Sequence, residues 1–175
     1  SEFVNYYIPY KNITNFLEDD FYTIWKKNFN TYEFNFDSFT HKDFEFINLI
    51  YVDNNISNYK CGIIDFQSAF IGFKGWDLFS ILENPRINFN RKHNDDLIKY
   101  FYDKINIKTD FNLFRSQYYL LNLARHTRLL GRWIKLINEG NEQYLNYINP
   151  TIKSINSSLE NIEDDKLRKI YKNIL

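Results

Sequence analysis

The chain has 175 residues, of which 44% are hydrophobic and 19% aromatic, so it can bury the core of one domain or of two small ones and is not a disordered chain. Its 22 basic and 22 acidic residues cancel, which excludes a charge-driven attraction to nucleic acid or to an anionic membrane. A single cysteine, Cys61, excludes an internal disulfide framework, and the lack of a long apolar run or signal peptide predicts a cytoplasmic protein without a membrane segment.

The first predicted elements are a helix and a β-hairpin. Residues 14–29 carry acidic residues early and lysines late, an order that suits the helix dipole. Apolar residues recur there at helical spacings: Phe16, Phe21, Ile24 and Trp25. Residues 47–52 and 60–66 are short apolar runs, and the polar residues 53–59 separate them. Two such runs around one polar loop predict a β-hairpin.

Two helices are predicted after the hairpin. The first begins at about Trp76 and ends before Pro85, because the residue before a proline disfavours the helical conformation. The second covers 92–105. Its expected inner face consists of Leu97, Ile98, Phe101 and Ile105.

The last third of the chain is also predicted to be helical. The longest periodic segment is 110–139. Its ends are marked by Thr109 or Asp110 as an N-cap and by Gly140 as a C-terminal stop. Two further helices are expected over 141–149 and 151–173, with Pro150 at a helix start. The predicted fold class is therefore α+β and mostly helical, with one small hairpin.

Two carboxylates and a carboxamide lie where the predicted hairpin strands begin or end. Asp43 and Asn48 are five residues apart, and Asp65 follows the second apolar run. Each residue alone is better explained by a turn, a loop or a strand end, but a hairpin would bring their two loops to the same end of the sheet. Together they suit phosphoryl transfer, with Asp43 orienting an acceptor hydroxyl or taking its proton, and Asn48 and Asp65 offering oxygen ligands to Mg²⁺.

Other polar residues near this set have structural explanations. His41 precedes a turn with apolar neighbours, where a buried histidine can hold a loop in shape. Asp77, on the first turn of the next predicted helix, is the expected partner of that loop. His93 lies among charged residues and is interpreted as a solvated surface residue.

A stripe of basic residues follows the long predicted helix. Arg125, Arg128 and Arg132 recur at spacings of three and four, with His126 beside them. Such a stripe is usually a solvated helix face, which is our interpretation of Arg132. For the others, a wall that contacts an anionic part of a substrate is the alternative interpretation, and it stays open for Arg125 and His126.

These residues carry a resemblance to a known family. The segments HKDFEFINLIY (41–51) and GIIDFQSAFIGFKGWDLFSIL (62–82) resemble the aminoglycoside phosphotransferase and choline kinase-like family, whose members carry His-x-Asp-x₄-Asn and then Ile-Asp-Phe or Ile-Asp-Trp. Three more segments are similar to the cell-wall sugar kinases of that family, the N-acetylmuramate/N-acetylglucosamine 1-kinases. They are FVNYYIP (3–9), LLNLARHTRLLGRWIKL (120–136) and EQYLNYINP (142–150).

The resemblance implies a protein-kinase-like C-terminal lobe that transfers the γ-phosphate of ATP, with Mg²⁺, to a hydroxyl of an amino sugar such as N-acetylmuramate. It implies Asp43 as the catalytic aspartate and Asn48 and Asp65 as the magnesium ligands. The chain departs from the family at three positions. Glu45 stands where histidine is common, Ser68 where an acidic residue often follows the metal-binding element, and Phe73 in place of a common proline.

The candidate substrate-binding residues are Glu45, Arg125, His126 and Arg128. The arginines and the histidine would attract an anionic sugar and repel a polycationic aminoglycoside. Nothing in the sequence resembles the glycine-rich loop or the strand lysine that hold ATP phosphates in kinases. We therefore expect the helical C-terminal lobe alone, with its N-terminal lobe removed or on another chain, and little kinase activity from these residues by themselves.

Two alternatives to a sugar kinase stay open. The first is a degenerate kinase-like module that binds a ligand or partner without transferring phosphate. The second keeps the chemistry but changes the acceptor to an aminoglycoside antibiotic or choline, because a metal site of this kind contacts only phosphate and one hydroxyl.

Overall fold

The computed structural model describes residues 1–53, 59–87, 93–105 and 107–175. The chain is α+β and mostly helical, in agreement with the predicted class. It forms two compact units. We call Ser1–Glu33 with Ile107–Leu175 the helical unit, and Phe34–Asn106 the hairpin unit. Within the described ranges, no helix combines the length and the apolar character needed to cross a membrane.

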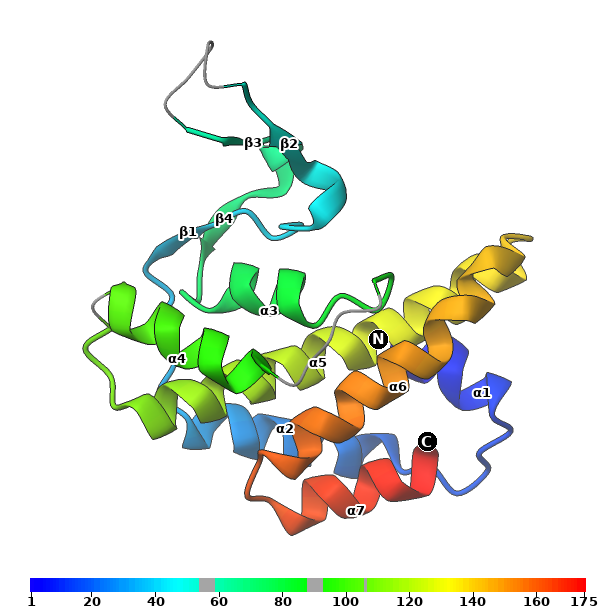
Figure 1. Cartoon of the computed structure of the whole chain (residues 1–175). Coiled ribbons are helices and arrows are strands. Elements are labelled where there is room, and N and C mark those ends of the chain that lie inside the picture. Colours follow the sequence, from blue (N-terminus) through cyan, green and yellow to red (C-terminus); the bar gives the residue numbers. More distant parts are fainter. Residues whose placement is uncertain (54–58, 88–92, 106) are drawn as a thin grey trace. The chain divides into compact units, whose positions relative to one another are not determined.

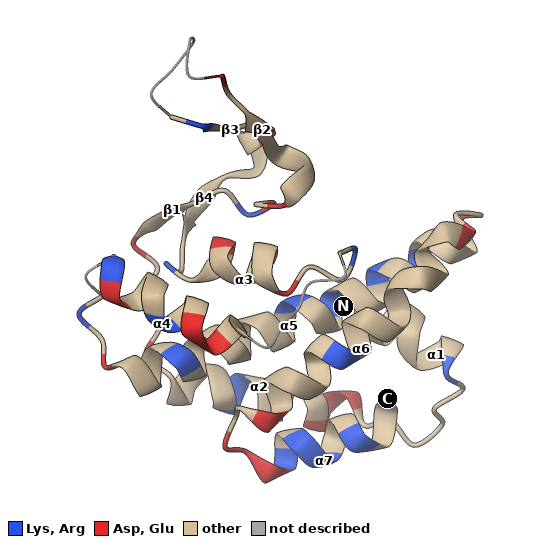
Figure 2. Cartoon of the chain, in the orientation of Figure 1, with Lys and Arg blue, Asp and Glu red and all other residues tan. Residues whose placement is uncertain are grey.

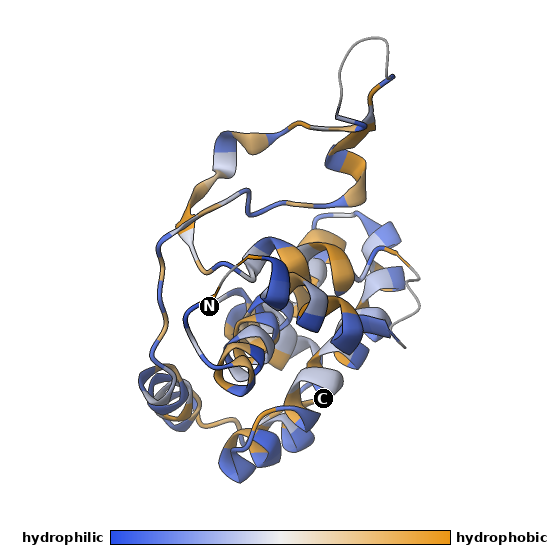
Figure 3. Cartoon of the chain, turned by 60° about the vertical axis from the view of Figure 1, so that its left-hand side comes forward, coloured by the Kyte–Doolittle hydropathy of each residue, from blue (hydrophilic) through white to orange (hydrophobic). Residues whose placement is uncertain are grey.

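The helical unit is built around the long helix α5, beside which α6 runs (Figure 1). Its elements are η1 (Phe3–Tyr7, a π-helix), α1 (Ile8–Tyr10), α2 (Glu18–Thr31), α5 (Phe111–Asn138), η5 (Glu142–Tyr144, a 3₁₀-helix), α6 (Leu145–Glu160) and α7 (Asp165–Ile174). Hydrophobic and hydrophilic residues alternate along the helices (Figure 3), as expected for helices that bury one face.

An aromatic cluster joins the two ends of the chain inside the helical unit. The ring of Tyr171 on α7 has no exposed surface and lies 6.2 Å from the ring of Phe21 and 6.3 Å from that of Trp25, both on α2. Phe3 stacks on Phe21 at 5.7 Å. Burial of aromatic side chains of this size, together with their ring contacts, is a large stabilising term for a unit of this kind.

Both ends of α5 follow the prediction. The Asp110 carboxylate caps the first turn by accepting the backbone N–H of Asn112 at 2.8 Å and of Leu113 at 3.3 Å. At the other end, Gly140 has a φ of +95°, the left-handed conformation for which glycine is favoured after a helix.

Two predicted helices have different bounds in the structure. α2 begins at Glu18 and not at residue 14, because Leu17 is extended and the acidic residues at 18–20 form the first turn, where the helix dipole favours them. The predicted break at Pro150 is wrong, because Pro150 lies within α6 and the chain breaks only after Glu160. A proline in the second turn removes one helical hydrogen bond, and burial of Thr151 and Ile155 just after it keeps the helix docked.

The hairpin unit contains two separate two-stranded antiparallel sheets. Its elements up to the second sheet are β1 (Ser38–Thr40), η2 (Phe46–Asn48), β2 (Leu49–Tyr51), β3 (Cys61–Ile63), η3 (Phe66–Ser68) and β4 (Phe70–Gly72). β2 pairs with β3, with Leu49 opposite Ile63, which confirms the predicted hairpin. The polar loop expected between them falls mostly on 54–58, outside the described residues.

The other sheet, β1 with β4, was not predicted. Its register puts Phe39 opposite Ile71, and both side chains are exposed, whereas Thr40 and Gly72 are buried on the opposite face. The sheet therefore buries a small, partly polar face and exposes an apolar one.

Among the described residues, the hairpin unit also contains the helices α3 (Trp76–Leu82) and α4 (Asn94–Lys104). α3 ends before Pro85, as predicted. The start of the second helix was expected at residue 92, which is outside the described residues. Of its predicted inner face, Ile98 is fully buried, but Leu97 is 37% exposed, because adjacent positions on a helix point about 100° apart.

Candidate functional site

Asp43, the predicted catalytic residue, lies in the segment that joins β1 to β2. The turn before it is held by Asp77 on the first turn of α3. The Asp77 carboxylate accepts the backbone N–H of His41 at 2.8 Å and that of Lys42 at 3.0 Å. Lys42 has a φ of +76°, a left-handed conformation that a lysine adopts only when its surroundings hold it there. Two hydrogen bonds to an ionised acceptor provide that restraint.

The ring of His41 ties this segment to the end of the second hairpin strand. His41 is buried, and its Nε2 lies 2.9 Å from the carbonyl oxygen of Ile64. A carbonyl oxygen only accepts, so Nε2 carries the ring proton. Nδ1 is buried and has no hydrogen-bond partner in the part of the chain that the structure describes. These contacts of His41 are those of a residue that orders the backbone of the loop.

Asn48 connects Asp43 with the second strand. Its Nδ2 donates to the backbone carbonyl of Asp43 at 2.8 Å, and its own carbonyl accepts the N–H of Ile64 at 3.0 Å. Because the side-chain nitrogen points at Asp43, the side-chain oxygen of Asn48 is directed away from that carbonyl and is available as a ligand. Asp65 follows Ile64 directly, so Asn48 is hydrogen-bonded both to Asp43 and to the residue before Asp65.

Asp65 is exposed and lies just before η3 in a left-handed conformation, with φ 66° and ψ 40°. Aspartate is one of the few residues other than glycine that adopt this conformation readily. Gln67 donates its Nε2 to one carboxylate oxygen of Asp65 at 2.8 Å. This hydrogen bond orients the carboxylate, and sequence reasoning did not single out Gln67.

The donor set at this junction suits a hard divalent cation. Mg²⁺ takes oxygen ligands, usually one or two carboxylates with several retained waters, and Asp43, Asn48 and Asp65 offer two carboxylates and an amide oxygen. Among residues 1–53, 59–87, 93–105 and 107–175, no group of three or more His, Cys, Asp or Glu side chains is arranged to hold a metal. A cation here would therefore depend on the amide of Asn48 and on water.

Glu45, the candidate substrate-binding residue of this loop, is buried and paired. Its carboxylate oxygen lies 2.5 Å from Nη1 of Arg86, which follows α3, and the backbone N–H of Arg86 is held by Asn84 at 2.9 Å. Sequence reasoning missed Arg86, since 41 residues separate the two partners and no motif connects them.

The basic stripe predicted on the long helix lies on α5, in the helical unit. Arg125 and His126 are buried, and Nδ1 of His126 lies 2.9 Å from the carbonyl oxygen one helical turn earlier. Arg128 is exposed, with Nη1 3.8 Å from the carboxylate of Glu2, and Arg132 pairs with the same carboxylate at 2.9 Å. The stripe is therefore partly buried and partly neutralised by Glu2.

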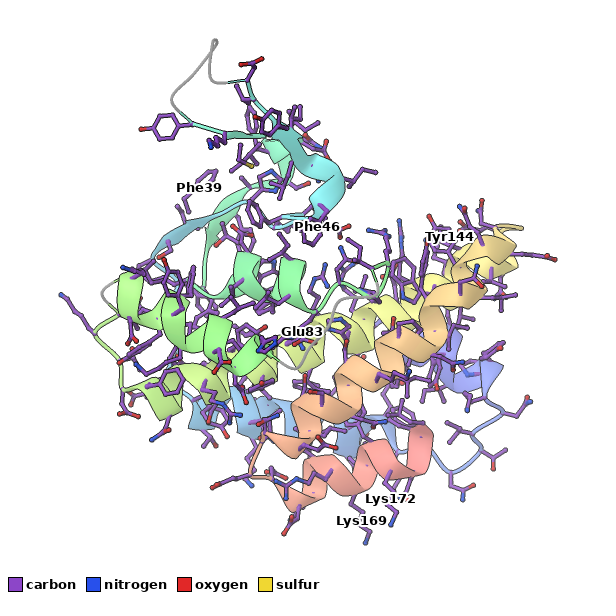
Figure 4. The ribbon with its side chains drawn as sticks, in the orientation of Figure 1. Phe39, Phe46, Glu83, Tyr144, Lys169 and Lys172 are labelled. Atoms are coloured by element: carbon purple, nitrogen blue, oxygen red, sulfur yellow. The ribbon has the colours of Figure 1, made fainter. Side chains whose placement is uncertain are left out.

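Exposed apolar side chains are concentrated on the strands and turns of the hairpin unit. Phe39 and Phe46 are two of them (Figure 4). Others are at least 60% exposed: Ile47, Tyr51, Tyr59, Phe66 and Ile71. Single exposed apolar residues are ordinary, whereas large contiguous apolar patches are a feature of interaction sites.

Neither the models of known protein families nor the curated proteins compared with the chain give a match.

Proposed function

We propose that the hairpin unit carries the phosphoryl-transfer site of a protein-kinase-like phosphotransferase. Its substrates would be Mg-ATP and a small molecule with a hydroxyl group, such as an amino sugar of the N-acetylmuramate type. The observation that supports this most is the hydrogen-bonded junction of Asp43, Asn48 and the strand end before Asp65. Two carboxylates and a carboxamide on adjoining loops are the oxygen set that kinase-like phosphoryl transfer uses.

In the proposed reaction, the acceptor oxygen forms a bond to the γ-phosphorus and the bond to the β–γ bridging oxygen breaks, so ADP leaves. Asp43 orients the acceptor hydroxyl and takes its proton. The side-chain oxygens of Asn48 and Asp65 would hold Mg²⁺, which neutralises charge on the phosphates when bound. Asp77 and His41 act only on the backbone of the loop, as positioning residues.

The proposal includes a further lobe that covers the nucleotide and lies either on the same polypeptide or on another chain. The apolar side chains on the hairpin unit support this part of the proposal, because a surface of this kind is normally covered in the working protein. Residues that hold ATP phosphates would come from that lobe.

An activity assay tests the proposal. ADP release from Mg-ATP would be measured with the product of the whole gene and a panel of N-acetylmuramate, N-acetylglucosamine, kanamycin and choline. Asp43→Asn and Asp65→Asn should each lower the turnover by at least about 100-fold, which is the usual weight of a proton acceptor or of a charge-stabilising group. Asp96→Asn, which alters a carboxylate that is 83% exposed on α4, is the matched control and should keep full activity.

A metal-binding measurement separates the site from the activity. Mn²⁺ added to the 175-residue chain should broaden the amide signals of residues 43–48 and 63–66 first, and Asp65→Asn should remove the effect. Turnover that survives Asp43→Asn would refute the proposed mechanism. Metal binding with no turnover on any acceptor would favour the alternative, a kinase-like binding module.

A further inference from the structure

A cavity of about 720 Å³ opens in the helical unit between α2, α7 and residues 13–17, far along the sequence from the proposed phosphoryl-transfer residues. This volume is within the range of roughly 300–1,000 Å³ that small-molecule sites occupy. The apolar part of its lining consists of Ile13, Phe16, Leu17, Ile24, Ile170 and Ile174.

Two lysines stand over this apolar lining. Lys166 and Lys169 are three residues apart on α7, so they are neighbours on one helix face. Both are exposed, and neither forms an ion pair with any residue that the structure describes. Lys and Arg recur along α7 after an acidic start (Figure 2), and the side chain of Lys169 extends away from the ribbon (Figure 4). Asp20, on α2, is the one acidic residue among the lining residues that the structure describes.

We propose that this cavity binds an amphipathic anion, an aliphatic chain with a single carboxylate. The aliphatic chain of the ligand would lie on the apolar lining, where contact with Ile24 and Ile170 removes it from water. The carboxylate would lie at the α7 side, between Lys166 and Lys169 and away from α2, because Asp20 repels it there. The cavity volume is that of a small-molecule site, so we propose a small molecule as its occupant.

Three ligands of matched structure test this. Octanoate, octylammonium and acetate would be titrated, below micelle concentrations, into the ¹⁵N-labelled 175-residue chain. Octanoate should shift the amide signals of residues 13–24 and 166–174 to saturation. Octylammonium carries the opposite charge on the same alkyl chain, and acetate carries the same charge without the long alkyl chain. Both should therefore bind at least about 10-fold more weakly than octanoate. Added salt should weaken octanoate binding.

Variants assign the binding to this cavity. The double substitution Lys166→Gln/Lys169→Gln should weaken octanoate binding about 10-fold, as expected for the loss of two exposed ion pairs. Lys172→Gln, on the same helix but outside the lining, is the control and should change nothing. Leu17→Asn, at a side chain that is 66% exposed, should weaken binding without affecting folding. Equal affinity for octylammonium, shifts in other parts of the chain, or unchanged binding by the double variant would each overturn the proposal.

Discussion

Replacing Gly131 by alanine would add a methyl group where the backbone of the N-terminal segment already lies. A Cβ atom at this position of α5 would be 2.3 Å from the carbonyl carbon and oxygen of Glu2 and 2.3 Å from the nitrogen of Phe3. Non-bonded carbon atoms rest about 3.5–4 Å apart, so the N-terminal segment would have to move by about 1 Å or more. A backbone cannot give way as the end of a flexible side chain can.

The size of the effect follows from what that segment buries. Phe3 is 1% exposed and Tyr7 is fully buried, and their rings stack at 5.2 Å. A shift that keeps them docked should cost about 1–3 kcal/mol, as overpacking generally does. Complete release of both side chains would cost about 3–6 kcal/mol, at about 1.5–3 kcal/mol for each. Alanine returns up to about 1 kcal/mol through its helix propensity. We expect the segment to be released, so Gly131→Ala should lower the free energy of unfolding by about 2–6 kcal/mol, or Tm by about 4–24 °C.

Urea unfolding followed by tryptophan fluorescence measures this change, because Trp25 and Trp133 are both buried in the helical unit. Gly140→Ala is the matched control. A Cβ there meets no atom within 4 Å, and only the left-handed φ of +95° opposes it, at about 1–2 kcal/mol. The reasoning is refuted if Gly131→Ala unfolds at the same urea concentration as the parent, or costs no more than Gly140→Ala.

Two further predictions concern carboxylates that accept hydrogen bonds from backbone N–H groups. Burial raises the pKa of Asp164, but the hydrogen bond from the N–H of Leu167 and the Lys27 ammonium at 3.0 Å lower it more, so its pKa lies below the ordinary value. A lowered pKa stabilises the fold above about pH 4, and that effect is lost as the pH falls through the folded pKa. Asp164→Asn keeps a capping side chain but removes the charge that pairs with Lys27, so it should cost about 0.5–1 kcal/mol at pH 7 and progressively less as the pH falls below about 4, measured by urea unfolding across that range. Asp77→Asn should speed hydrogen exchange of the amides of His41 and Lys42 by about 10- to 100-fold, since it leaves one acceptor for two donors, whereas unchanged exchange would show that the loop is held by other contacts.

The elements that were predicted well from the sequence are those whose sequence pattern and end residues lie within or next to the element itself. The β2–β3 hairpin has its two apolar runs close together, and α5 has a capping aspartate before it and a glycine after it. Local chemistry of this kind does not depend on what packs against the element, so it can be recognised without a structure.

The predictions that failed or were missed depend on distant residues. β1 and β4 are three residues each and lie about thirty residues apart, too short for a periodic signal, and only their pairing defines them as strands. Pro150 normally favours a helix start, but packing of α6 against α5 keeps the helix continuous through it. For the candidate site, the sequence predicted which residues lie at the hairpin junction, but the Glu45–Arg86 pair and the Gln67 contact required coordinates.

The helical unit is assembled from two separated stretches of chain, and this has a consequence for synthesis on the ribosome. Residues 1–33 emerge before the hairpin unit, but their docking surfaces on α5 and α7 are translated only after the entire hairpin unit. At about 5–20 residues per second, Phe3, Phe21 and Trp25 stay without those partners for several seconds or more. The nascent chain therefore exposes a hydrophobic aromatic segment during that interval. A chaperone that recognises such segments should bind ribosome-bound intermediates that stop before α7, and it should release them once Tyr171 has joined the cluster.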